Sequence, residues 1–109
     1  MATAAELVMF ESAGCPYCRA WDREIGAIYP LSDLAAAAPL RRVDIDAERP
    51  SDLAGIDAIV FTPTFVLFDD GREVGRITGY IGEYQFWGLL DGMFRPMPRS
   101  AERSVAEGL

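Results

Sequence analysis

The feature that most constrains the fold is a pair of cysteines in the run Cys15-Pro16-Tyr17-Cys18. They are the only cysteines among 109 residues, and the chain contains no histidine. The pair follows an apolar run at residues 7–10 and opens a stretch with helical spacing, which predicts a helix N-terminus. Unpaired N–H groups and the helix dipole there favour a thiolate, the attacking species in disulfide exchange. The pattern therefore predicts a redox pair that alternates between dithiol and disulfide.

Three other uses of Cys-x-x-Cys fit less well. A structural zinc site needs four ligands, and two thiols without histidine cannot supply them within one chain. A purely structural disulfide closing so short a loop would add little stability and would not need a helix start. A copper-carrier loop also uses this spacing, but Pro16 between the thiols suits the first turn of a helix better. We therefore expect no metal site.

Length and charge narrow the function further. A chain of 109 residues forms one domain, which we place at residues 1–94, and residues 95–109 read as a polar, mobile tail. The net charge of −7 argues against nucleic acid and anionic membrane surfaces as partners. No apolar run approaches the roughly 20 residues that span a bilayer.

The first half of the chain predicts a strand followed by a helix. Residues 7–10 are short and apolar, as in a buried strand. From Pro16 a helix should run to Pro30, with an apolar face formed by four residues at spacings of four, four and three: Tyr17, Trp21, Ile25 and Ile28. Ser32 can cap a second short helix that Pro39 stops.

The second half predicts a strand, a short helix, a hairpin and a last helix. We expect a period-two strand at 40–46, a helix at 51–59, strands at 64–69 and 73–78 joined by an Asp-Gly turn, and a helix at 82–94. The buried face of the helix at 82–94 should hold Phe86, Leu89, Leu90 and Met93. The order β-α-β-α-β-β-α predicts an α/β fold with a mixed four-stranded sheet and helices on both faces.

Thr62-Pro63 immediately precedes the strongest strand signal. Proline is allowed at the first position of a strand, so Pro63 could be a simple entry residue. Together with the cysteine pair and the element order, however, the chain resembles the thioredoxin and glutaredoxin superfamily over about residues 6–94. The resemblance implies a thioredoxin fold with a cis Pro63 beside Cys15 and Cys18. It also implies that the backbone of Thr62 pairs with a substrate strand.

Within that superfamily, the motifs of this chain match neither glutaredoxins nor thioredoxins throughout. Cys-Pro-Tyr-Cys is similar to glutaredoxins, whereas Met9 stands where thioredoxins place a buried acid and Arg42 where they keep a lysine. Glutathione is a possible cofactor, but it carries two carboxylates and needs basic partners and a Gly-Gly-x-x-Asp-like helix start. Residues 79–83 only approximate that pattern, so strong glutathione specificity is not favoured.

Longer stretches resemble the SoxS-type thioredoxins, namely residues 10–18, 21–22, 29–31, 39–44, 61–67, 79–80 and 86–90. These are periplasmic proteins of bacterial sulfur-oxidation systems, thought to keep a cysteine of the sulfur-carrier protein SoxYZ reduced. The resemblance implies a periplasmic location, with the cytoplasm as the alternative. Residues 1–5 are too short for a signal peptide, as in a mature chain whose signal has been removed. An external membrane or soluble thiol reductant must recharge the pair, and we expect a monomer.

These observations assign roles to individual residues. We expect Cys15, the more exposed thiol, to attack a partner disulfide, and Cys18 to resolve the mixed disulfide. Tyr17 and Pro16 would tune the thiolate, although helical spacing more simply predicts core or groove packing for Tyr17. The expected substrate-binding residues are Thr62, Pro63, Gly79 and Tyr80. Three alternatives stay open: a glutathione-dependent reductase or disulfide isomerase, a relative bridging an iron–sulfur cluster, and a non-catalytic binding module.

Overall fold

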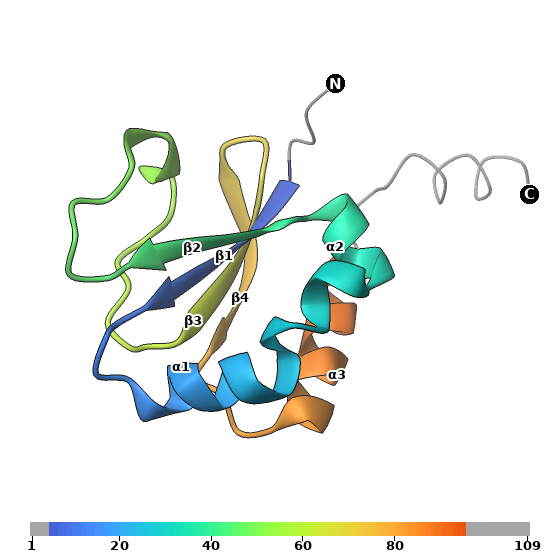
Figure 1. The fold of residues 1–109 in the computed structure, drawn as a ribbon. Helices are drawn as coiled ribbons and strands as arrows, with labels where there is room; N and C mark the ends of the chain where they lie inside the picture. The colour runs from blue at the N-terminus through green and yellow to red at the C-terminus, as the bar shows by residue number, and fades with distance from the viewer. Residues whose placement is uncertain (1–4, 96–109) are drawn as a thin grey trace, which may run out of the picture.

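A mixed four-stranded sheet forms the centre of the computed structural model, which describes residues 5–95 (Figure 1). Its strands are β1 (Ala5–Glu11), β2 (Leu40–Asp44), β3 (Thr64–Asp69) and β4 (Arg72–Thr78), in the order β2-β1-β3-β4. β1 is parallel to β2, and the β1–β3 and β3–β4 pairs are antiparallel. The predicted α/β fold and sheet are confirmed; beyond Arg95, the predicted C-terminal tail lies outside the described residues.

β1 is buried on both faces because a hydrophobic cluster covers each side of the sheet. Leu7 and Met9 point into one hydrophobic cluster, and Val8 and Phe10 point into a second cluster on the opposite face. All four side chains are buried. Alternate residues of a strand point to opposite faces, so a continuous apolar run is what a doubly covered strand requires.

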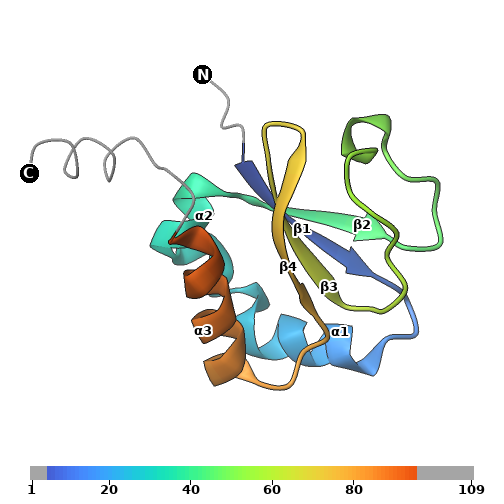
Figure 2. The same ribbon diagram turned by 180° about the vertical axis from the view of Figure 1, so that it is seen from behind.

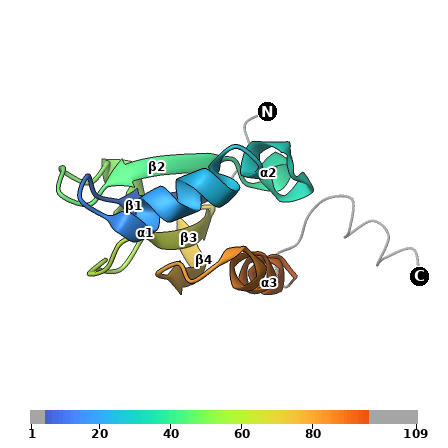
Figure 3. The same ribbon diagram turned by 60° about the horizontal axis from the view of Figure 1, so that its bottom comes forward.

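The helices pack on the face that carries Leu7 and Met9. They are α1 (Pro16–Trp21), α2 (Asp33–Ala37) and α3 (Glu83–Phe94). In Figure 3, α1 runs across β1 and β3, and the Trp21 ring lies 5.2 Å from Phe65. α3 packs beside β4 (Figure 2), and Phe86 contacts Trp21 with ring centroids 5.8 Å apart. An aromatic core thus joins the helix after the cysteines to the sheet and to α3.

The predicted apolar face of the first helix is only half correct. After α1 the backbone continues as a π-helix, η1 (Asp22–Gly26), and then as a 3-10 helix, η2 (Tyr29–Leu31). Trp21 and Ile25 are buried as expected, but the exposed fractions of Tyr17 and Ile28 are 60% and 50%. A π turn holds more residues than an α turn, so the next inward position moves from Ile28 to Tyr29. The buried Tyr29 hydroxyl donates to the Ala38 carbonyl at 2.6 Å.

The buried face of α3 also differs from the prediction, at Leu89 and at Phe94. Phe86, Leu90 and Phe94 are buried, and Met93 is half-buried. The exposed fraction of Leu89, expected in the core, is 46%. The buried positions of α3 recur at a spacing of four, and Leu89 lies beside this stripe.

The opposite face of the sheet is covered by a loop instead of the predicted helix at 51–59. Only one turn of 3-10 helix, η3 (Ser51–Leu53), forms there, and Leu53 and Ile56 supply the buried contacts. The backbone of Gly55 passes so close to the β3–β4 turn that a Cβ would lie 2.5 Å from the carbonyl oxygen of Gly71. This close approach favours glycine and an irregular chain over a continued helix.

Two glycine substitutions should change stability in opposite directions. Gly55→Ala should lower the free energy of unfolding by about 1–3 kcal/mol, because the new methyl collides with backbone. Gly88→Ala should raise it by up to about 1 kcal/mol, because alanine favours a helix and the added Cβ meets no atom within 4 Å. Urea unfolding of both variants and the parent chain measures the two effects. A stable Gly55→Ala would contradict the close approach.

Candidate active site

The two cysteines lie at the start of α1, shortly after the end of β1. Cys15 is the N-cap residue of α1, with extended backbone angles, and Pro16 begins the helix as predicted. Cys15 and Cys18 form a disulfide, and the Cys18 backbone N–H donates to the Cys15 sulfur at 3.0 Å. Both residues are buried, Cys15 at 5% and Cys18 at 2% exposure. The sulfur of Cys15 therefore occupies the position at which a helix N-terminus binds negative charge.

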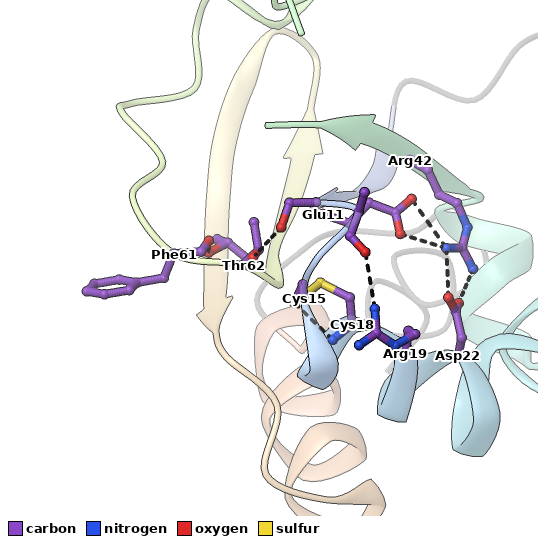
Figure 4. Close-up of a disulfide and its surroundings, with 11 residues drawn as sticks. Glu11, Cys15, Cys18, Arg19, Asp22, Arg42, Phe61 and Thr62 are labelled. Atoms are coloured by element: carbon purple, nitrogen blue, oxygen red, sulfur yellow. Dashed lines mark hydrogen bonds and ion pairs between the residues drawn. A yellow bond between two sulfur atoms is a disulfide. The ribbon is translucent and has the colours of Figure 1, made fainter. Parts of the chain in front are cut away.

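Two side chains without an assigned role in the sequence analysis, those of Ser12 and Arg19, hold the loop before Cys15. The Ser12 hydroxyl hydrogen-bonds the Thr62 hydroxyl at 3.3 Å, and the Ser12 carbonyl accepts from the Cys15 N–H at 3.3 Å. The Arg19 guanidinium reaches back to the Ala13 carbonyl at 3.1 Å. Figure 4 shows Thr62 and Arg19 on either side of the disulfide. No sequence motif predicts these contacts, because they depend on how a distant loop and a side chain of α1 pack against the segment before Cys15.

The peptide bond between Thr62 and Pro63 is cis, as the family resemblance implied. Pro63 is buried, and its carbonyl accepts the Gly79 N–H at 2.7 Å. The Thr64 hydroxyl donates to the Phe61 carbonyl at 2.6 Å, which ties down the other side of the proline. The segment before β3 and the segment after β4 are thus joined beside Thr62.

An apolar groove of about 420 Å³ brings most of the predicted binding residues together. It is lined by Tyr17, Phe61, Thr62, Thr78, Gly79, Tyr80 and Ile81. The exposed fractions of Tyr17, Phe61 and Ile81 are 60%, 64% and 79%. The interpretation of Tyr17 as a core residue is therefore wrong, and its groove interpretation is supported. Phe61, whose ring points away from the disulfide in Figure 4, and Ile81 were missed because the sequence pattern assigns apolar residues to the core.

Arg42 is held by carboxylates beside α1, the redox helix, which begins at the cysteine pair. It pairs with Met9 in the β1–β2 register, and Met9 is fully buried. The Arg42 guanidinium binds Asp22 and also binds Glu11 at 3.0 Å (Figure 4). The hydrogen bond to Asp22, and then the nearby Glu11 carboxylate, raise the pKa of Arg42. Its charge is thus directed at two acids, one on β1 and one on η1.

Tyr80 is buried although it lines the groove. Its hydroxyl donates to the Glu24 carboxylate on η1. Burial, and then this hydrogen bond, raise the pKa of Tyr80 above the usual range of tyrosine. Tyr80 therefore remains a protonated donor at physiological pH.

Within residues 5–95, no group of three or more histidine, cysteine, aspartate or glutamate side chains could hold a metal ion. Over the same residues, every helix is too short or too polar to cross a membrane. Whether glutathione binds stays a prediction from the sequence.

Comparisons with known proteins identify the family. A family model described as a thioredoxin-like domain matches residues 4–94. The reduced periplasmic thioredoxin SoxS of Paracoccus pantotrophus is 44% identical, with a TM-score of 0.77 over 82% of this chain and 94% of that chain. Thioredoxin f2 of Chlamydomonas reinhardtii is 21% identical, with a TM-score of 0.61 over 91% of this chain and 85% of that chain. The second likeness shows the fold alone.

No curated protein is significantly similar to the sequence. The match over residues 4–94 and the identity to SoxS agree with the close-spaced Cys15–Cys18 disulfide and the cis Pro63. The chain therefore belongs to the thioredoxin-like family, is similar to its SoxS-type members, and is a thiol-disulfide oxidoreductase.

Proposed function

We propose that the protein reduces protein disulfides, with Cys15 as the nucleophile and Cys18 as the resolving thiol. The observation that carries this proposal is the Cys18 N–H, which donates to the Cys15 sulfur at 3.0 Å from the first turn of α1. A donor aimed at this sulfur stabilises negative charge there. The first turn of α1 also carries no acidic side chain that would oppose a thiolate.

The reaction transfers two electrons in two exchanges. The Cys15 thiolate attacks one sulfur of the partner disulfide, so that a mixed disulfide forms and the other partner sulfur leaves as a thiolate. The Cys18 thiolate then attacks the Cys15 sulfur, which releases the second partner thiol and closes the Cys15–Cys18 disulfide. The partner is reduced, this chain is oxidised, and an external thiol reductant returns it to the dithiol state.

The groove supplies a binding surface for the partner chain. An extended segment can lie along Thr62 and use its backbone groups. Gly79 also lines the groove, and the carbonyl of the buried Pro63 holds it in place. The apolar rims formed by Phe61 and Ile81 would cover apolar side chains of that segment. Pro16 and Tyr17 would tune the Cys15 thiolate by shaping the first turn of α1 and by shielding the sulfur.

We further propose that the partner is the sulfur-carrier SoxYZ and that the protein works in the periplasm. The support is the 44% identity to a protein named periplasmic thioredoxin SoxS, over 94% of that chain. The net charge of −7 is consistent with a protein partner and not with nucleic acid. The protein would act as a monomer, recharged by a membrane or soluble thiol reductant.

Replacing each cysteine separately should distinguish their roles. Cys18→Ser should accumulate a covalent mixed disulfide with an oxidised partner protein, because the resolving thiol is gone. Cys15→Ser should form no adduct and should reduce no disulfide. Non-reducing electrophoresis of each mixture, repeated after dithiothreitol, measures both outcomes. An adduct with Cys15→Ser but not with Cys18→Ser would reverse the assignment, and activity without Cys15 would favour a binding module.

The reduction potential should place the pair among reductants. We expect a value of about −270 mV, as for thioredoxin, when the pair is equilibrated with defined thiol/disulfide buffers. A value of about −120 to −180 mV would instead indicate an oxidant or isomerase. Mass spectrometry after thiol alkylation measures the fraction of dithiol in each buffer.

The SoxYZ assignment has its own test. The Cys18→Ser variant, exposed to a periplasmic extract from a sulfur-oxidising cell, should trap SoxYZ as its main adduct. The Cys15→Ser variant is the matched control and should trap nothing. Adducts formed mainly with other proteins would leave the disulfide reductase standing but reject SoxYZ as the principal partner.

A further inference from the structure

Tyr80 joins the groove to the redox helix through a single side chain. Its hydroxyl donates to Glu24, 56 positions earlier in the sequence. Its ring packs edge-on against Phe86, with centroids 6.2 Å apart, and the residue is 6% exposed. Because the hydroxyl is engaged on the protein side, Tyr80 is placed to act on the groove through its position, not through a polar contact with a substrate.

The backbone next to Tyr80 holds the cis-proline segment. Gly79 donates its N–H to the Pro63 carbonyl at 2.7 Å, and Thr78 pairs with Thr64 in the β3–β4 register. Gly79 has a φ of +87°, a backbone conformation that glycine adopts readily. The chain therefore leaves β4 in a sharp bend and needs a fixed point after it, which the buried Tyr80 provides.

Glu24 lies on η1, and the acids of this π-helix are tied to opposite edges of the sheet. Asp22 binds Arg42 on β2, and Glu24 binds Tyr80, which follows β4. β2 and β4 are the two outer strands, and the buried Ile25 directly follows Glu24 in sequence. π turns often occur at functional sites, where they redirect side chains. Here the turn directly extends the helix that carries both cysteines.

We propose that Tyr80 and Glu24 are a positioning pair that sets the spacing between the two walls of the groove. One wall is Tyr17 on the redox helix, and the other is formed by the loops that carry Thr62 and Ile81. The pair thereby selects extended protein chains over small disulfides. A polypeptide must contact both walls, whereas a small disulfide needs only the Cys15 sulfur. This inference rests on the proposed function and names the residues that give it preference for protein substrates.

The test compares two disulfides with the same reduced protein. The dithiol form, freed of reductant, is mixed with insulin or with bis(2-hydroxyethyl) disulfide, and alkylation at timed intervals gives two rate constants. Tyr80→Phe keeps the ring and removes the hydroxyl. We expect its loss of rate toward insulin to be about tenfold larger than toward the small disulfide, which corresponds to about 1.4 kcal/mol.

Matched variants separate positioning from general damage. Tyr84→Phe removes another tyrosine hydroxyl from the same region, on a residue that is 96% exposed, and should change neither rate constant. Glu24→Ala should reproduce Tyr80→Phe, and it carries the test if Tyr80→Phe does not fold. Glu24→Gln retains an oxygen acceptor and should restore most of the preference for insulin.

Two results would overturn the inference, and a third would overturn the proposed function instead. Equal losses toward both disulfides, in Tyr80→Phe or in Glu24→Ala, would show that the pair serves only general structure. No loss in either variant would show that the groove does not depend on it. If the unsubstituted protein reduced neither disulfide, the reductase proposal itself would fail.

Discussion

The hydrogen bond from the Cys18 N–H to the Cys15 sulfur depends on the helix start being held still. β1 ends at Glu11, and a short loop must place Cys15 at the N-cap of α1. The helix cannot shift easily, because Trp21 and Ile25 are buried against the sheet. The aromatic contacts with Phe65 and Phe86 therefore serve the redox pair as well as the core.

The sheet is covered unequally, and this arrangement places the groove. α1, α2 and α3 pack on one face, whereas η3 and its loop cover the other. The loop before β3 contacts the segment before α1 through Thr62, which hydrogen-bonds Ser12. The segment after β4 is bound to the same loop by the hydrogen bond from Gly79 to Pro63. The groove is consequently assembled from three parts of the chain that meet only in the folded protein.

Acid–base groups around the pair differ from the pattern that thioredoxins show. Met9 is apolar and buried where the family resemblance places an acid, so no carboxylate comes from that position. Arg42 binds Glu11 and Asp22, so that the charges of these three side chains lie at the partly exposed side of the helix and outside the core. The helix N-terminus is therefore the feature of this site that most directly favours a thiolate.

The sequence alone determined the redox pair and the helix start at Pro16, because spacing and turn chemistry act over a few residues. The cis Pro63 followed from the family resemblance. The sequence also determined the order of the strands and hence the mixed sheet, but not the loop that replaces the helix expected at 51–59. It could not foresee the π-helix that moves the buried position from Ile28 to Tyr29, or the close approach of Gly55 to Gly71. Only the tertiary structure decided that Tyr17 is exposed and that Glu24 meets Tyr80, since contacts between distant segments leave no local periodicity.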